Sequence, residues 1–222
     1  MQNLALPRAV LWDMDGTIVD TEPYWIEAEH TLVESYGGIW SDELAHECVG
    51  NQLLVSADII RANSPVTLSS PQVVDVLLES VVRQMKRHVP WRPGARELLL
   101  ALRDLGVPNA LVTMSYRSFA QVLVDSLPDG TFAAVVTGEV VREGKPAPEP
   151  YLAACRALSI DPGDCIAIED SPPGVASAVA AGVPTLAVPH IVVVPTRAGA
   201  VHLDSLAGLA PGDLWGLFSP VH

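Results

Sequence analysis

Positively charged residues are few in this sequence compared with negatively charged ones. Only two lysines and eleven arginines stand against 26 acidic residues, so the formal net charge is −13. The sequence pI is about 4.7. A surface of this charge repels a phosphate backbone, so we expect no nucleic-acid partner.

Cysteine is also rare, with three in 222 residues. Cys48, Cys155 and Cys165 form no CxxC pair and lie in apolar or helical surroundings. An odd number of cysteines without ligand spacing is typical of reduced thiols. We therefore expect no disulfide and no zinc site, and we expect a cytoplasmic location.

Long uninterrupted apolar runs are missing. The most apolar region, residues 174–195, is divided by Gly182, Pro184, Pro189 and His190 into a short helix and a strand. The first residues lack the basic segment, apolar stretch and small-residue cleavage site of a signal peptide. We expect neither a signal peptide nor membrane association.

What the chain does contain is an alternation of helices and strands. Hydrophobic residues make up 49% and charged residues 18%, which is typical of a folded chain with a sizeable core. Apolar runs predict strands at Arg8–Trp12, Asn109–Thr113, Phe132–Val136, Cys165–Glu169 and Thr185–Val188. Helical patterns fall at Ala95–Leu105, Tyr116–Ser126, Glu149–Leu158 and Pro173–Ala181. Such alternation predicts a parallel sheet covered by helices.

Between the first two strands the pattern is purely helical. The predicted helices are Tyr24–Ser35, Ser41–Cys48, Leu53–Ala62 and Pro71–His88. A stiff connector, Pro90–Gly94, follows them. We therefore predict an α/β fold with a Rossmann-like parallel sheet core, helices on both faces and an inserted all-helical cap. The core comprises residues 1–19 and 91–222, and the cap residues 20–90. Beyond about residue 190 the pattern is hard to read, although residues 215–218 could form a terminal helix.

Polar residues follow three of the predicted strands. Asp13 and Asp15 follow the first, Thr113 ends the second, and Glu169 and Asp170 end the fourth. Ligands bind outside the carboxyl ends of parallel strands, so we expect these side chains to converge. Residues two apart in an extended segment point to the same side, and Asp13 and Asp15 would repel unless a cation or a proton lies between them.

Four carboxylates in one cleft require a compensating cation, and Mg²⁺ matches these hard oxygen donors. Such a metal organises phosphate oxygens, to which Thr113 and the neighbouring amides of Met114 and Ser115 could donate. Lys145 stands between a glycine and a proline and is one of two lysines in the chain. In isolation it would be a solvated loop residue, but here we interpret it as a point charge that steadies the phosphate and the nucleophilic carboxylate.

Taken in order, these motifs resemble those of the haloacid dehalogenase-like (HAD) superfamily. The matching residues are Asp13-Met14-Asp15-Gly16-Thr17, Thr113, Lys145 before Pro146, and Glu169-Asp170-Ser171 followed by Gly174. The resemblance extends over roughly residues 8 to 190, and four ordered motifs are more specific than any one of them. A helical insert after the first motif is similar to the subgroup that contains beta-phosphoglucomutase and small sugar-phosphate phosphatases.

The resemblance implies a role for each acidic residue. Asp13 would be the nucleophile and a metal ligand, and Asp15 the general acid/base and a ligand through its main-chain carbonyl. Asp170 would be the remaining protein ligand, with Glu169 beside or behind the metal. An aspartyl-phosphate intermediate divides one difficult displacement into two easier ones. The favoured function is thus a Mg²⁺-dependent phosphatase acting on a small, sugar-phosphate-like metabolite.

A phosphosugar mutase of the same architecture is the alternative. The mutases that this chain resembles use an arginine of the cap, shortly after a glycine that corresponds to Gly50. In this chain the first basic residue after Gly50 is Arg61. Residues 20–90 carry four basic and eleven acidic side chains, a net charge of −7. Such a cap suits a substrate whose distal end is neutral and rich in hydroxyls.

Substrate contacts are expected from the cap, and the candidates are Glu22, Trp25, Asn51 and Gln52. A third reading is a non-catalytic sensor of a phosphorylated ligand. It is disfavoured because a binding module has no use for a nucleophile (Asp13) beside a proton donor (Asp15). The expected partner is a small phosphorylated metabolite, and the expected assembly is a monomer or a weak dimer.

Overall fold

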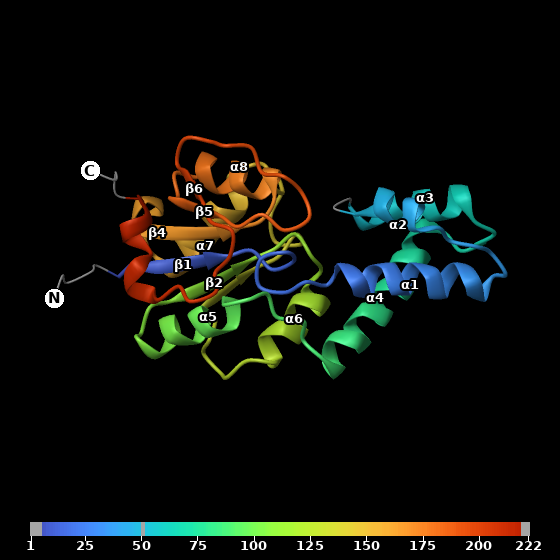
Figure 1. The fold of residues 1–222 in the computed structure, drawn as a ribbon, viewed down its shortest axis with the longest axis horizontal. Coiled ribbons are helices and arrows are strands. Elements are labelled where there is room, and N and C mark those ends of the chain that lie inside the picture. Colours follow the sequence, from blue (N-terminus) through green and yellow to red (C-terminus); the bar gives the residue numbers. More distant parts are fainter. Residues whose placement is uncertain (1–5, 50–51, 219–222) are drawn as a thin grey trace. The chain divides into compact units, whose positions relative to one another are not determined.

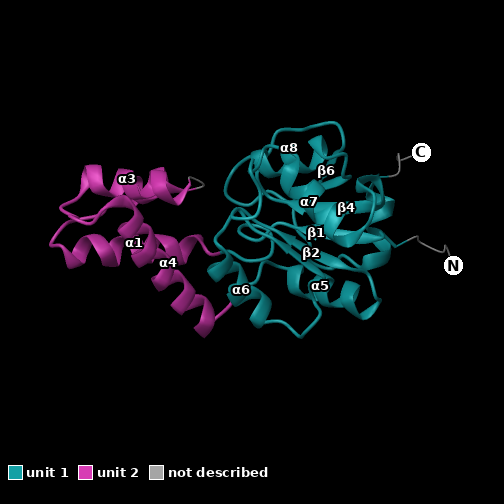
Figure 2. Ribbon diagram, turned by 180° about the vertical axis from the view of Figure 1, so that it is seen from behind, with its two compact units in different colours: residues 1–20, 90–222 teal, residues 21–89 magenta. Residues whose placement is uncertain are grey.

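A computed structural model describes residues 6–49 and 52–218. The chain forms two compact units, coloured separately in Figure 2. We call residues 21–89 the helical unit, and the parts of the chain up to residue 20 and from residue 90 onward the core unit. The insert expected from the sequence spans residues 20–90, so the two divisions differ by one residue at each end.

The core unit is built on a six-stranded sheet in which every strand pair is parallel. Its strands are β1 (Ala9–Trp12), β2 (Asn109–Val112), β3 (Ala134–Val136), β4 (Cys165–Glu169), β5 (Thr185–Ala187) and β6 (Ala200–His202). The spatial order is β3-β2-β1-β4-β5-β6. Leu11 lies beside Ala110 on one side and Ala167 on the other. All four residues of β1 are buried, as expected of a central parallel strand.

Helices cover both faces of this sheet. They are α5 (Ala95–Asp104), α6 (Arg117–Asp125), α7 (Glu149–Leu158) and α8 (Pro172–Ala180). α7 packs on β1, β2 and β3, α8 packs on β4 and β5, and the two helices contact each other. Figure 1 shows α5 and α6 on the other side of the sheet. The predicted fold class, a Rossmann-like parallel sheet between helices, is confirmed.

The sequence did not predict β6 or the form of the last helical segment. β6 is a three-residue edge strand that is partly exposed, and so short a segment shows neither a buried run nor a period. Residues Trp215–Phe218 form a 3-10 helix, η3, instead of an α-helix. Both differences fall in the part of the chain after residue 190.

The two chain segments that connect the units run side by side within the core unit. The N–H of Asp20 donates to the carbonyl of Pro90 at 2.9 Å, and the N–H of Arg92 donates to the carbonyl of Ile18 at 2.8 Å. The chain therefore leaves and re-enters the core unit at adjacent points.

The helical unit consists of α1 (Glu22–Ser35), α2 (Asp42–Cys48), α3 (Leu53–Asn63) and α4 (Ser70–Arg87). α4 contacts both α1 and α3. It buries Val73, Leu77 and Val81, which recur every four residues and form one apolar face. A buried acid also lies in this unit: Glu29 is 4% exposed and accepts a hydrogen bond of 3.1 Å from the indole of Trp40. Across the described ranges, no helix has the length and apolar character needed to cross a membrane.

Candidate active site

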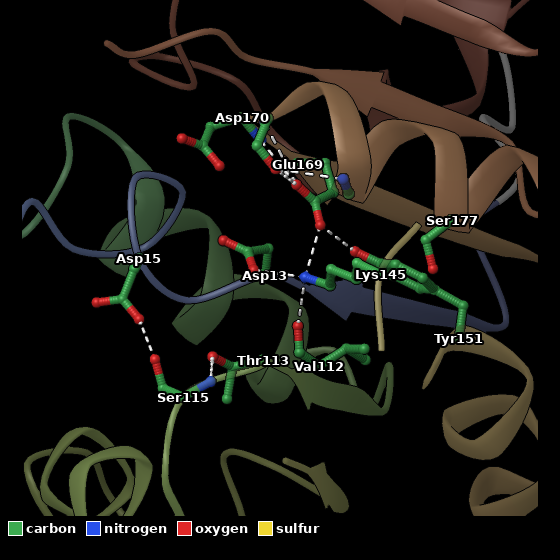
Figure 3. A network of polar contacts seen from close by, with 12 residues as sticks. Asp13, Asp15, Val112, Thr113, Ser115, Lys145, Tyr151, Glu169, Asp170 and Ser177 are labelled. Atoms are coloured by element: carbon green, nitrogen blue, oxygen red, sulfur yellow. Dashed lines mark hydrogen bonds and ion pairs between the residues drawn. The ribbon is translucent and has the colours of Figure 1, made fainter. Parts of the chain in front are cut away.

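Three strand ends supply the side chains of the site. Asp13 follows β1 directly, Thr113 follows β2, and Glu169 is the last residue of β4. β1 lies between β2 and β4, so these three ends adjoin at the carboxyl edge of the sheet. Figure 3 shows the resulting network of polar contacts.

Asp13 is the most constrained of the carboxylates. It is 7% exposed, and its Oδ1 accepts a hydrogen bond of 2.6 Å from Nζ of Lys145. Within residues 6–49 and 52–218, its buried Oδ2 has no hydrogen-bond partner. Burial raises the pKa of Asp13 to about 7; Lys145 opposes this increase, and Glu169 and Asp15 add to it. One oxygen of this carboxylate is therefore left available for a ligand.

Lys145 is the cation at the centre of the network. Its Nζ lies 2.6 Å from Oδ1 of Asp13, 2.6 Å from Oε1 of Glu169 and 2.9 Å from the carbonyl of Val112. Burial alone would lower the pKa of this ammonium, but the two carboxylates more than offset that effect and raise it. The lysine is thus held by three acceptors, and its role in steadying a phosphate stays a prediction.

Two glutamates hold the loop that carries Lys145. Oε2 of Glu139 accepts a hydrogen bond of 2.6 Å from the N–H of Arg117, the first residue of α6. Glu149, in the first turn of α7, accepts hydrogen bonds of 3.1 and 2.9 Å from the N–H groups of residues 142 and 143. The loop is thus tied to the helices on both sides of it.

Glu169 accepts hydrogen bonds or ion pairs on both of its oxygens. Oε1 lies 2.8 Å from the hydroxyl of Tyr151 and 2.6 Å from Nζ of Lys145. Oε2 accepts from the N–H of Asp170 at 3.2 Å and from the N–H and Oγ of Ser171 at 3.4 and 3.1 Å. With this many donors, the carboxylate is an anchor for the turn after β4.

Two glycines make room for the acidic side chains. A Cβ at Gly174, in the first turn of α8, would lie 1.9 Å from Oε1 of Glu169. A Cβ at Gly16 would lie 2.0 Å from Oδ2 of Asp170, and Gly16 also has a φ of +85°, in the left-handed region. Only glycine fits either position without displacing a carboxylate.

Asp170 completes an acidic cluster with Asp13 and Glu169. One oxygen from each of the three carboxylates lies within 4.8 Å of the others. Asp170 is 8% exposed, and its pKa is raised to about 8 by burial and by its two acidic neighbours, against the opposing effect of Lys145. The expected convergence of these three residues is therefore observed.

The cluster fits a hard divalent cation. The ammonium of Lys145 pairs with two of the three buried carboxylates, Asp13 and Glu169. All the possible ligand atoms are oxygens, and Oδ2 of Asp13 has no partner in the described part of the chain. Because both oxygens of Glu169 are already engaged, Asp13 and Asp170 are the better-placed ligands.

Asp15 is not one of the three carboxylates whose oxygens lie within 4.8 Å of one another, although its charge adds to the raised pKa values of Asp13 and Asp170. Its Oδ2 accepts a hydrogen bond of 2.7 Å from Oγ of Ser115 (Figure 3). β1 ends at Trp12 and a tight turn follows, in which the N–H of Gly16 donates to the carbonyl of Val19. The alternation of an extended strand therefore does not continue to Asp15.

Thr113 and Ser115 are linked through a short turn after β2. The N–H of Ser115 donates to Oγ1 of Thr113 at 3.0 Å, which leaves the hydroxyl hydrogen of Thr113 able to donate elsewhere. Met114, between them, is half-buried. This segment brings two hydroxyl groups to the same sheet edge as Asp13.

The candidates for substrate contact belong to the helical unit. Glu22 and Trp25 lie in α1 and are half-buried, and Gln52 is exposed just before α3. Asn51 lies outside the described residues. Their contact with a substrate stays a prediction.

The sequence did not single out Tyr151. This residue is fully buried in the first turn of α7, and its hydroxyl contacts Glu169. An aromatic residue in an apolar helix is ordinarily a core residue, so the sequence pattern did not indicate that Tyr151 contacts the site. The one available signal was its position six residues after Lys145, at the start of the next helix.

Comparison with known proteins gives consistent matches. The family model described as haloacid dehalogenase-like hydrolase matches residues 7–182. Phosphorylated carbohydrates phosphatase of Thermotoga maritima is 31% identical over 184 residues, or 79% of this chain and 82% of that protein. Bifunctional riboflavin kinase/FMN phosphatase of Arabidopsis thaliana is 31% identical over 189 residues, or 84% of this chain; the chain spans 49% of that protein.

A solved structure agrees over nearly the whole chain. CbbY from Rhodobacter sphaeroides, in complex with phosphate, superposes with a TM-score of 0.81 at 26% identity. The match covers 96% of this chain and 100% of that chain.

Proposed function

Because this chain belongs to the haloacid dehalogenase-like hydrolase family, we propose that it is a Mg²⁺-dependent phosphatase of a small, sugar-phosphate-like metabolite. The observation that carries the proposal is the arrangement around Asp13: a buried carboxylate with one oxygen bound to Lys145 and the other without a partner in the described chain. The related phosphorylated carbohydrates phosphatase supports the substrate class. We further propose a cytoplasmic location and a monomer or weak dimer.

The reaction proceeds in two displacements. In the first, the carboxylate of Asp13 attacks the phosphorus, a P–O bond forms to Asp13, and the bond to the substrate oxygen breaks while Asp15 gives that oxygen a proton. In the second, water attacks the phosphorus of the acyl phosphate and loses a proton to Asp15. The bond to Asp13 breaks, and inorganic phosphate leaves.

The surrounding residues orient the phosphoryl group. Thr113 donates its hydroxyl hydrogen to a phosphate oxygen, with the main-chain N–H of Met114 beside it. The N–H of Ser115, also a proposed donor to the phosphate, would first have to leave Oγ1 of Thr113. Lys145 balances the charge that builds up on the phosphoryl oxygens and on Asp13.

Asp13 and Asp170 would hold Mg²⁺ through their side chains, with the main-chain carbonyl of Asp15 as a third ligand and Glu169 behind them. The cation would neutralise the phosphate and the cluster and polarise the phosphorus for attack. Its affinity is expected to depend on the anchor formed by Glu169.

The helical unit would act as the cap that selects the substrate. Its net charge disfavours a second phosphate, which favours hydrolysis of a monophosphate over a mutase reaction. Glu22, Trp25, Asn51 and Gln52 are the proposed contacts, with Trp25 able to stack on a sugar ring.

The test is phosphate release from a panel of sugar and polyol phosphates, with Mg²⁺ or with EDTA. We expect turnover that EDTA abolishes, no turnover by Asp13→Asn, and normal turnover by the control Asp104→Asn, whose side chain is 64% exposed. If Asp13→Asn released phosphate as fast as the wild type, the mechanism would be refuted. In a second arm a sugar bisphosphate primer is added, and isomerised sugar phosphate in excess of free phosphate would identify a mutase.

A further inference from the structure

Tyr151 is a buried polar group that the proposed reaction leaves without a role. Its side chain is fully buried, and its hydroxyl donates a hydrogen bond of 2.8 Å to Oε1 of Glu169. Nζ of Lys145 lies 5.4 Å from the centre of its ring. One side chain thus contacts both partners of the ion pair between Lys145 and Glu169, as Figure 3 shows.

The acceptor of this hydrogen bond is what distinguishes Tyr151 from an ordinary core tyrosine. A buried phenol needs some acceptor, and a main-chain carbonyl would satisfy it. Here the acceptor is the same oxygen that Nζ of Lys145 approaches at 2.6 Å. Burial raises the pKa of Tyr151 well above its usual range, with Glu169 and Asp13 adding to the effect, so the phenol remains a donor.

We propose that Tyr151 is a positioning residue that, by holding Oε1 of Glu169, sets how Lys145 is shared between Glu169 and Asp13. This inference rests on the proposed function, in which Asp13 is the nucleophile.

The geometry around Glu169 explains why one hydroxyl matters. Oε2 is held by Asp170 and Ser171, whereas Oε1 has contacts with Tyr151 and Lys145. Without the phenol, the charge of Oε1 would be balanced by Lys145 alone. The ammonium would then be drawn toward Glu169 and away from Oδ1 of Asp13, which it contacts at 2.6 Å. Asp13 would lose part of the interaction that aligns it.

The test uses Tyr151→Phe, which keeps the ring and removes the hydroxyl. Its matched control is Thr185→Val, which removes another fully buried hydroxyl from the core unit, one that donates to the carbonyl of Val183 at 2.8 Å. Calorimetric titration gives the Kd for Mg²⁺, and steady-state kinetics give kcat and KM. For Tyr151→Phe we expect an approximately tenfold weaker Kd and about tenfold lower kcat, with KM changed less than about twofold. Thr185→Val should match the wild type.

A double-mutant cycle tests whether the effect passes through Glu169. In a Glu169→Gln background, Tyr151→Phe should change the Kd for Mg²⁺ by less than about twofold, because the shared acceptor has lost its charge. The proposal is overturned if Tyr151→Phe weakens the Kd for Mg²⁺ as much in the Glu169→Gln background as in the wild type. It is also overturned if the single variant Tyr151→Phe has the Kd and kcat of the wild type. The titration needs no turnover. Failure of the wild type to release phosphate from any ester would instead overturn the proposed function, and the two failures are distinguishable.

Discussion

The hydroxyl of Ser115 donates a hydrogen bond of 2.7 Å to Oδ2 of Asp15, joining the turn after β2 to the turn after β1. The same residue donates its N–H to Oγ1 of Thr113 at 3.0 Å. The proposed proton donor and the proposed phosphate ligand are therefore held by one residue.

Removing this hydroxyl should impair the proton transfers. For Ser115→Ala we expect kcat to fall about tenfold with little change in KM, because Asp15 loses the hydrogen bond that orients it. Phosphate-release kinetics measure both constants. Ser126→Ala is the matched control, since Ser126 donates to the carbonyl of Leu123 at the end of α6. An unchanged kcat in Ser115→Ala would mean that Asp15 needs no such orientation.

The two lysines of the chain provide a second comparison. Lys145→Met should lower kcat by about 10²-fold or more, because the charge beside Asp13 and the phosphate is lost. Lys86→Met changes an exposed residue of α4 and should leave kcat within about twofold of the wild type. The rates are compared at saturating substrate and Mg²⁺. Equal losses in the two variants would contradict a specific role for Lys145.

Gly174 offers a test by steric clash. In Gly174→Ala the new Cβ would lie 1.9 Å from Oε1 of Glu169, so the anchor must move. We expect a loss of about 1–3 kcal/mol in the free energy of unfolding. Urea denaturation measures this quantity. In the control, Gly163→Ala, the Cβ meets nothing within 4 Å, and the change should stay within about 0.5 kcal/mol. Equal stabilities would show that Glu169 is not confined as described.

The buried Glu29 of the helical unit should make the free energy of unfolding depend on pH. Burial raises its pKa from 4.5 to about 7; Trp40 opposes the increase and Glu22 adds to it. Between these two values the folded state binds more protons than the unfolded state. The contribution of Glu29 to the free energy of unfolding should therefore fall as the pH rises from 4.5 to 7 and then level off.

Glu29→Gln removes that titration and should be about 2–3 kcal/mol more stable than the wild type at pH 8, but similar to it near pH 4.5. The exposed Glu27→Gln is the control and should follow the wild type at both pH values. Urea denaturation at the two pH values gives the comparison. Parallel behaviour of Glu29→Gln and wild type would show that Glu29 is not buried as a neutral acid.

The fold was predictable where local pattern and burial agree. β4 and α7 have the bounds expected from the sequence, because β4 is a fully buried apolar run and α7 begins among prolines and ends before Ser159 in the left-handed region. β6 was missed because a three-residue edge strand has no period of its own.

Some contacts of the site were predictable from the sequence and others were not. The meeting of Asp13 with Glu169 follows from strand order alone, since β1 adjoins β4. The orientation of Asp15 depends on a turn, and the role of Tyr151 depends on a tertiary contact between α7 and β4. Neither contact leaves a periodic signal in the sequence.

The adjacent hydrogen bonds that tie Asp20 to Pro90 and Ile18 to Arg92 have a consequence for how such enzymes can diversify. Since the chain departs and returns at neighbouring points, a shorter or different insert can bridge the same gap without altering the register of the sheet. The proposed determinants of specificity therefore lie in one continuous stretch of sequence, which can be exchanged without altering the strands that carry Asp13 and Glu169.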